Sequence, residues 1–360
     1  MADPSQVTGV GILGLGVYLP PDVRRNDWWS PEVVAQWANR GRAAPPPITG
    51  DLSAGARRVI EAVRTQVQDP FQGAVERRVL APSLTHTDME ANAAREAIDR
   101  SGIDPHQINL LLTHTVAPEY QLSNPAAVLH ARLGLAPACF SAQIEAAAYS
   151  FLMQLSIAEA MIASGRARYA LLVQSAVSSR LMQPDDPVSP YFGDGATAVV
   201  VGPVQGRGLC GSVHYTDGRY PRTIIAGVPG STWYDEGRAV IHVGDPVGLG
   251  AVLMQTVDLC KTSVDAVLES TKLSPDDIDF FCIHQGTSWL RQIAQEFSGL
   301  GSAATIETFA STGYLFSAIM PLGLRMATDA GTLAPGDLVL LFGGGTGMTY
   351  GATVIQWGRA

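Results

Sequence analysis

The sequence predicts a large α/β protein in which two corresponding halves stack as five layers, α/β/α/β/α. Helical and strand-like apolar segments alternate along the chain, which is typical of α/β folds. Residues 101–115 align without a gap on residues 271–285, and residues 169–173 match residues 338–342 at nearly the same offset. We therefore expect an internal duplication. Two halves that each bury one face of a sheet pack against one another in layers.

Composition limits the class of protein and of partner. The chain has 360 residues, of which 46% are hydrophobic and 16% charged, so it can bury a large core in one or two globular domains. A net charge of −9 without a cluster of Lys and Arg argues against nucleic acid or an anionic membrane as the main partner. A small molecule or a small protein is favoured instead. The chain lacks a long apolar stretch and a signal-peptide pattern, so we expect a soluble cytoplasmic protein.

The four cysteines stand far apart and form neither a C-x-x-C pair nor a metal-ligand spacing; they are Cys139, Cys210, Cys260 and Cys282. This spacing predicts no structural zinc and no other metal site. In a reducing compartment each cysteine is expected to be a packed free thiol. Cys139 is therefore not expected to act as a nucleophile.

The first apolar segment, residues 10–19, predicts a strand that ends at Pro20. It contains a G-x-G pattern, but Pro20 and Pro21 follow where a helix should begin, and no acidic residue lies at the expected distance. These departures argue against a dinucleotide site. We expect no nicotinamide or flavin cofactor.

Residues 26–72 form a long excursion that separates this strand from the next regular segments. It predicts two or three helical pieces, interrupted by the Pro-rich residues 43–47, and it carries Trp28 and Trp29. Long loop-rich excursions of this kind are typical of lids or partner surfaces.

The remaining segments repeat in order, and the division between the halves is expected near residue 205, giving domains 1–205 and 206–360. In the first half the pattern predicts helices at 87–101 and 151–163 and strands at 108–115, 169–173 and 197–201. In the second half it predicts helices at 247–270 and 289–297 and strands at 278–283, 338–342 and 352–357.

Residues 143–151 are the stretch from which we infer a functional site. They follow a strand-like run and lead into the buried helix at 151–163. The first turn of a helix offers unpaired N–H groups and the positive end of a dipole, which favours an anion or a thiolate. The residues at this turn, Ala146 to Ala148, include no nucleophile. Tyr149 and Ser150 are closer than Cys139, but the helix is expected to turn both side chains away.

Six short motifs occur in order along the duplicated chain, at residues 14–20, 75–78, 145–158, 192–196, 284–285 and 342–351. Together they resemble the β-ketoacyl-acyl-carrier-protein synthase III branch of the thiolase superfamily, over almost the whole length. The resemblance implies the thiolase fold and a homodimer. It implies no cofactor other than an acyl thioester, carried on coenzyme A or on the phosphopantetheine of an acyl carrier protein.

The resemblance also assigns roles to particular residues. Ala148 stands at the position of the family's nucleophilic Cys, and His284 matches its catalytic His, which would act as base. Tyr314 stands at the position of its Asn. The backbone N–H groups of residue 148 and Gly347 match its oxyanion hole, although Gly347 could instead be a turn glycine. Phe192 belongs to a turn that resembles the one beside the family's substrate pocket.

Two departures from the family pattern shape the expected function. Ala148 removes covalent catalysis, while Tyr314 can still donate one hydrogen bond or simply fill space. Decarboxylative condensation in the family uses His and Asn together, so the loss of Asn argues against that step. We therefore expect an acyltransferase that moves an acyl group from a carrier-protein or coenzyme A thioester to an acceptor, in polyketide or related secondary metabolism. As written it is expected to be inactive or slow.

Ala148 has two explanations that the sequence leaves open. Either a Cys or Ser was changed to Ala, or the chain naturally lacks a nucleophile. In the second case it is a partner subunit of a heteromeric ketosynthase or a non-covalent catalyst. A decarboxylative condensing enzyme is a further alternative. The repeat mate of His284 is His114, which we interpret as a histidine at the edge of the core.

The partner and the binding surface are less specific predictions. Trp28 and Trp29 could line an acyl or pantetheine tunnel, or could anchor the excursion hydrophobically. Because the excursion is longer than in the family, contacts with the adenine of coenzyme A cannot be assigned, and a carrier protein is favoured as the donor. Arg291 is the one cation in the segment after His284 that could meet an acidic carrier.

Overall fold

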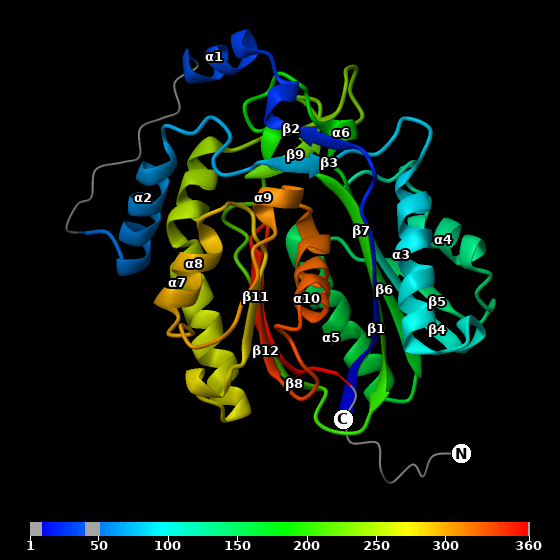
Figure 1. Cartoon of the computed structure of the whole chain (residues 1–360). Helices are drawn as coiled ribbons and strands as arrows, with labels where there is room; N and C mark the ends of the chain where they lie inside the picture. The colour runs from blue at the N-terminus through cyan, green and yellow to red at the C-terminus, as the bar shows by residue number, and fades with distance from the viewer. Residues whose placement is uncertain (1–8, 40–50, 359–360) are drawn as a thin grey trace.

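The computed structural model describes residues 9–39 and 51–358, and it contains two large sheets with helices between and outside them (Figure 1). The first sheet has the strand order β1-β7-β6-β4-β5. Its strands are β1 (Gly9–Tyr18), β4 (Ile108–Thr115), β5 (Phe140–Gln143), β6 (Tyr169–Val177) and β7 (Asp194–Val204). β4 runs parallel to β5 and β6, and β7 runs antiparallel to β1 and β6.

The second sheet has the order β11-β12-β13-β8. Its strands are β8 (Leu209–Thr216), β11 (Phe280–Ile283), β12 (Leu338–Gly345) and β13 (Thr349–Gln356). β11 and β12 are parallel, and the other pairs are antiparallel. The strands of the first sheet end at Val204 and those of the second begin at Leu209, so the chain crosses between sheets there. Two short ribbons accompany them: β2 (Val23–Arg25) with β3 (Glu76–Arg78), and β9 (Ile224–Gly227) with β10 (Val240–Val243).

The helices form three layers around these sheets. Figure 1 shows α5 and α10 between the sheets, α3 and α4 outside the first sheet, and α7 and α8 outside the second. Their bounds are α3 (His86–Ser101), α4 (Pro125–Leu133), α5 (Ser150–Ala163), α7 (Pro246–Thr271), α8 (Leu290–Phe297) and α10 (Ile319–Asp329). The predicted α/β/α/β/α layering is confirmed. The inner helices are apolar on most sides because both sheets cover them.

The excursion at 26–72 contains the two longer helices and one short turn that the sequence predicts. They are the 3-10 turn η2 (Asn26–Trp28), α1 (Pro31–Asn39) and α2 (Ala54–Gln66); residues 43–47 lie outside the described residues. α2 packs beside α7. Ser53 caps α2 and donates a 2.5 Å hydrogen bond to Asp258 of α7, which also accepts the Gly55 N–H at 3.1 Å. The excursion therefore covers the outer helices of the second half.

The two halves enter their inner helices through the same local geometry. α5 follows the 3-10 turn η4 (Ala147–Tyr149), and α10 follows the 3-10 turn η7 (Phe316–Ala318). The first residue of each turn has a positive φ, 48° at Ala147 and 49° at Phe316, which is costly for a residue with a side chain. The offset between these turns is the one that aligns 169–173 with 338–342. Position 148 therefore corresponds to Ser317.

Two shorter α-helices are α6 (Ser178–Leu181) and α9 (Phe309–Thr312), and three further 3-10 turns are η3 (Pro105–Gln107), η5 (Ser189–Tyr191) and η6 (Pro275–Asp277). Within the described residues, none of the helices is both long and apolar enough to cross a membrane.

Candidate active site

Three consecutive glycines at the end of β12 bring the helix-entrance turn and His284 to one place. A Cβ on Gly344 would lie 3.4 Å from His284 Cε1, and a Cβ on Gly343 would lie 3.1 Å from the Tyr149 ring. A Cβ on Gly345 would overlap the carbonyl oxygen of Ala146. β12 can therefore approach the turn only because Gly345 lacks a side chain, whereas a Cβ on Gly344 would make an ordinary contact with His284. Strand β12, from the second half, joins the turn of the first half to His284.

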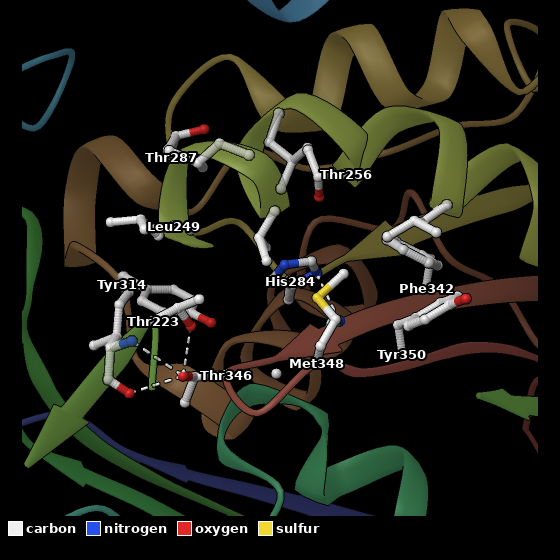
Figure 2. Close-up of a pocket in the computed structure, with 18 of the residues that line it drawn as sticks. Thr223, Leu249, Thr256, His284, Thr287, Tyr314, Phe342, Thr346, Met348 and Tyr350 are labelled. Carbon is white, nitrogen blue, oxygen red and sulfur yellow. Dashed lines mark hydrogen bonds between the residues drawn. The ribbon is translucent and has the colours of Figure 1, made fainter. Parts of the chain in front are cut away.

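His284 lies at the wall of a cavity of about 170 Å³, here called the His284 cavity (Figure 2). Helix α7 supplies an apolar wall that includes Leu249, Val252 and Leu253. The polar atoms in the lining come from a few residues, namely Thr223, Thr256, His284, Thr287, Tyr314, Thr346 and Tyr350. A mostly apolar cavity with a few polar groups is typical of a site for a small molecule or an acyl chain.

The hydrogen bonds of His284 determine which nitrogen carries its proton. The backbone N–H of Gly344 donates to His284 Nδ1 at 3.2 Å, so the neutral ring is protonated at Nε2. Burial lowers the pKa of His284 to about 4, although a hydrogen bond to the backbone of Phe342 acts in the opposite direction. At neutral pH this ring is therefore an uncharged donor through Nε2–H. That state suits polarising a carbonyl better than the base role expected from the sequence.

Tyr314 and Phe192 also line the His284 cavity, as the resemblance implies for Phe192. Their rings form a cluster with Phe316: the ring centroids of Phe192 and Phe316 lie 5.5 Å apart, and those of Tyr314 and Phe316 lie 5.0 Å apart. The Tyr314 N–H donates to Tyr191 O at 2.7 Å, which fixes this loop. Burial raises the pKa of Tyr314. Its hydroxyl therefore stays protonated and can donate a hydrogen bond into the cavity, in addition to the Nε2–H of His284.

Ala148 lies beside this cavity but does not line it. Ala148 is buried. Its turn is connected to the cavity through Gly345, which lines the cavity and lies against the carbonyl group of Ala146. Gly347 lies in the turn between β12 and β13, where an added Cβ would meet nothing within 4 Å. The structure therefore brings position 148, His284 and Tyr314 to one region. For Gly347 it supports the alternative interpretation, that of a turn glycine. Its part in an oxyanion hole stays a prediction.

A second cavity, of about 160 Å³, opens beside the same turn and is here called the Glu145 cavity. Its lining includes Val116, Glu145, Ala147, Ile224, Ile225, Ala226, Ile241, Phe316 and Thr346. Ile224 and Thr346 line both cavities. Thr346 Oγ1 donates to the Ile224 carbonyl at 2.8 Å and accepts the Ile224 N–H at 3.2 Å (Figure 2). The linings of the two cavities therefore share this hydrogen-bonded pair.

The two tryptophans of the excursion serve as anchors. Trp29 is buried, its Nε1–H donates to Pro184 O at 2.7 Å, and its ring packs on Trp37 and Phe71. Trp28 is 49% exposed, with Arg24 stacked 3.8 Å above its ring. Neither tryptophan lines one of the two cavities. Of the two interpretations that the sequence left open, the structure supports hydrophobic anchoring over a tunnel wall.

Two further predictions concern structural residues. All four cysteines are free, and burial raises the pKa of Cys139 to about 11, so its thiol is unreactive at neutral pH. Asp194, in the turn after Phe192, accepts hydrogen bonds from the N–H groups of Leu80 at 2.7 Å and Ser179 at 2.9 Å. Its role is therefore structural.

Comparison with protein families shows which family models match this chain. The model described as 3-oxoacyl-[acyl-carrier-protein] synthase III matches residues 142–218, and its C-terminal counterpart matches residues 268–357. The thiolase N-terminal domain matches residues 58–176. These matches contain both the turn at position 148 and His284.

The chain is a synthase III-like member of the thiolase superfamily.

Solved structures have the same fold over the full length of this synthase III-like protein. The 3-oxoacyl-[acyl-carrier-protein] synthase III of Thermus thermophilus is 26% identical, with a TM-score of 0.76, over 97% of this chain and 100% of that one. The priming β-ketosynthase of the R1128 polyketide biosynthetic pathway is 23% identical, with a TM-score of 0.79, over 100% and 99%. OleA of Xanthomonas campestris, solved with lauric acid and lauroyl-CoA, is 19% identical, with a TM-score of 0.74, over 98% and 100%. The predicted thiolase fold is confirmed.

Several residues of the synthase III-like site were not predicted from the sequence. For the α7 wall of the His284 cavity the sequence predicts only a helix, because its periodicity does not show which face meets a cavity. Glu145 was noted as part of a motif without a role. The signal that could have identified it is positional, because Glu145 directly precedes the Ala turn and His114 is the repeat mate of His284.

Proposed function

We propose that this synthase III-like protein transfers an acyl group from a thioester to an acceptor. The observation that carries the proposal is the His284 cavity, in which the Nε2–H of His284 and the hydroxyl of Tyr314 are two donors at a largely apolar wall. Two donors of this kind stabilise the negative charge that develops on a thioester oxygen when its carbon is attacked. The apolar wall from α7 suits an acyl chain.

The solved relatives support a proposal for the donor and the metabolic setting. One of them is a priming β-ketosynthase of a polyketide pathway, and another was solved with lauroyl-CoA. We therefore propose a donor on coenzyme A or on an acyl carrier protein, and a role in polyketide or related secondary metabolism. A homodimer and a cytoplasmic location belong to the same proposal.

Position 148 decides whether the transfer passes through an acyl-enzyme. Ala148 has no atom that can take an acyl group, so the chain as written can transfer only directly from thioester to acceptor. A Cys or Ser at this position would stand at the start of α5, beside the glycines that adjoin His284. We propose that such a residue would be acylated.

A partner subunit without its own chemistry is the second candidate function. The observation in its favour is that position 148 is an Ala that is buried and lines neither cavity. This candidate predicts that the chain is purified from its native cells together with a Cys-bearing homologue. A decarboxylative condensation is the third, and it predicts that malonyl-CoA releases carbon dioxide.

The proposed function is tested by the variant Ala148→Cys with acetyl-, butyryl-, octanoyl- and malonyl-CoA. We expect the intact mass to increase by one acyl group with at least one donor, whereas the unmodified chain shows no increase. His284→Ala in the Ala148→Cys background should slow this acylation about 10²-fold, by loss of a donor to the thioester oxygen. A folded Ala148→Cys variant that stays unmodified with all four donors contradicts the proposal.

A further inference from the structure

A chain of three polar side chains in contact runs from the second half of the molecule to the Glu145 cavity. Ser317 Oγ lies 2.6 Å from His114 Nδ1, and His114 Nε2 lies 3.4 Å from Glu145 Oε1. Ser317 belongs to η7, His114 to β4, and Glu145 to the loop after β5. Hydroxyl, imidazole and carboxylate are the three groups of a hydrolase triad.

The tautomer of His114 determines which groups donate and which accept along this chain. Within the described residues, the Ser317 hydroxyl forms a hydrogen bond with His114. If that hydroxyl donates to Nδ1, the neutral ring carries its proton on Nε2. The Nε2 atom is buried and, although it lies 3.4 Å from Glu145 Oε1, makes no well-formed hydrogen bond within the described residues. Its N–H then faces the Glu145 carboxylate.

Exposure shows which end of the chain a substrate can reach. The side chains of Ser317 and His114 are completely buried, whereas that of Glu145 is 61% exposed and lines the Glu145 cavity. In a hydrolase triad the hydroxyl faces the substrate and the carboxylate is buried. Here the order is reversed, so the carboxylate is the accessible group and Ser317 is the anchor.

Glu145 is held in the form that can accept a proton. Its Oε1 accepts the backbone N–H of Ala147 at 2.7 Å. Burial acts to raise the pKa of Glu145, but His114 and the Ala147 N–H outweigh it, so the pKa lies below its usual range. The carboxylate is therefore ionised at neutral pH.

The duplication explains why this chain lies where it does. His114 is the repeat mate of His284, and Ser317 occupies the position that corresponds to Ala148 in the other half. Each histidine therefore lies across from the inner-helix turn of the opposite half. The His114 pair has kept a hydroxyl where the His284 pair has Ala.

We infer that Glu145 is the general base that activates the acceptor, with His114 and Ser317 as positioning residues; this inference rests on the proposed acyl transfer. Its carboxylate takes the proton of an acceptor hydroxyl or amine as that oxygen or nitrogen forms its bond to the thioester carbon. The carbon–sulfur bond breaks, and the leaving thiolate recovers the proton from Glu145. His284 cannot take this proton, because its Nε2 already carries one.

The geometry of the two cavities is consistent with this division of work. The Glu145 cavity meets the His284 cavity at Ile224 and Thr346. An acyl thioester in the His284 cavity would receive hydrogen bonds from His284 and Tyr314. An acceptor in the Glu145 cavity would approach from the other side of Thr346, beside the base.

The test measures release of coenzyme A from butyryl- and octanoyl-CoA by the unmodified chain, with water, 1-butanol or butylamine as acceptor. Glu145→Gln keeps the shape and the contact with Ala147 but cannot accept the proton. We expect it to lower kcat about 10²- to 10⁴-fold with little change in KM. Glu159→Gln, which removes a half-buried carboxylate from α5, is the matched control and should be unchanged.

His114→Phe and Ser317→Ala test positioning. Both should lower kcat more than they raise KM, and His114→Phe should move the acid side of the kcat profile to higher pH, because the imidazole that lowers the pKa of Glu145 is gone. A merely structural role would leave this pH profile in place.

The outcomes separate the inference from the proposed function. Turnover by the unmodified chain that is unchanged in Glu145→Gln overturns the inference and leaves acyl transfer standing. If only Ala148→Cys reacts, decay of its acyl adduct is compared with and without Glu145→Gln. A decay at least tenfold slower supports the inference, and an equal decay overturns it. Neither turnover nor adduct overturns both.

Discussion

At the residue scale, the same residue type does different work in the two histidine environments of this protein. His284 accepts a backbone hydrogen bond at Nδ1 and presents Nε2–H to a cavity, whereas His114 is enclosed between a hydroxyl and a carboxylate. The first arrangement makes an electrophilic donor and the second a relay. The strand patterns do not distinguish them, because both histidines follow the same buried pattern, and only the family resemblance singles out His284.

The depressed pKa of His284 predicts a specific pH dependence of stability. The unfolded chain binds a proton at this His near pH 6.5, whereas burial lowers the folded pKa to about 4. Between these values the unfolded state holds more protons, so acidification lowers the free energy of unfolding, by up to about 3 kcal/mol from this group. The contribution is complete above pH 6.5 and lost near pH 4.

The measurement is urea unfolding of the unmodified chain and of His284→Phe between pH 7 and pH 4. The difference between the two proteins isolates this group from the carboxyl groups that titrate in the same range. The unmodified chain should lose more stability on acidification than the variant. Parallel curves for the two proteins would show that His284 titrates normally in the folded state.

At the element scale, the end of β12 holds the site together. Its glycines allow a strand of the second half to touch both the entrance turn of α5 and the His284 ring. The sequence predicted the strand at 338–342, the helix at 151–163 and the Gly-rich motif between β12 and β13. It did not predict which glycine touches what, since close approach depends on tertiary packing that no local pattern encodes.

Gly345→Ala tests this contact. The new Cβ would overlap the Ala146 carbonyl, so strand and turn must separate, and overpacking of this kind costs about 1–3 kcal/mol. We expect a lower melting temperature and slower acylation in the Ala148→Cys background.

Gly347→Ala is the matched control, because its Cβ would enter open space although its φ is +82°. It should cost about 1 kcal/mol and leave acylation intact. Equal acylation rates for the two alanine variants would show that the Gly345 contact does not position the turn.

At the scale of the whole molecule, the duplication accounts both for what the sequence predicts and for what it misses. Repeated patterns of helix and strand identify two halves and their layers, because each half must bury one sheet face. The candidate residues Ala148, His284 and Tyr314 follow from motifs within each half. The Glu145 chain joins three elements from both halves, and such a juxtaposition exists only after the halves have packed.

The contact between Ser317 and His114 should therefore report on the packing of the halves. Ser317→Ala leaves the buried Nδ1 of His114 without its partner, which costs about 1–3 kcal/mol. His114→Phe removes the same hydrogen bond from the other side. If the pair is coupled across the halves, the double variant should lose less stability than the two single losses together, by about 0.5–3 kcal/mol.

A control within one element shows whether the effect is specific to the contact between halves. Ser263 of α7 is also a buried hydroxyl, and it donates to its own helix at Leu259 O, 2.8 Å away. Ser263→Ala combined with His114→Phe should be additive, because the two residues share no partner. Coupling of the same size in both pairs would mean that the Ser317–His114 bond is not what joins the halves. Coupling confined to Ser317 and His114 would show that their hydrogen bond links the two halves structurally. The same pair would then both join the halves and support the proposed base, Glu145.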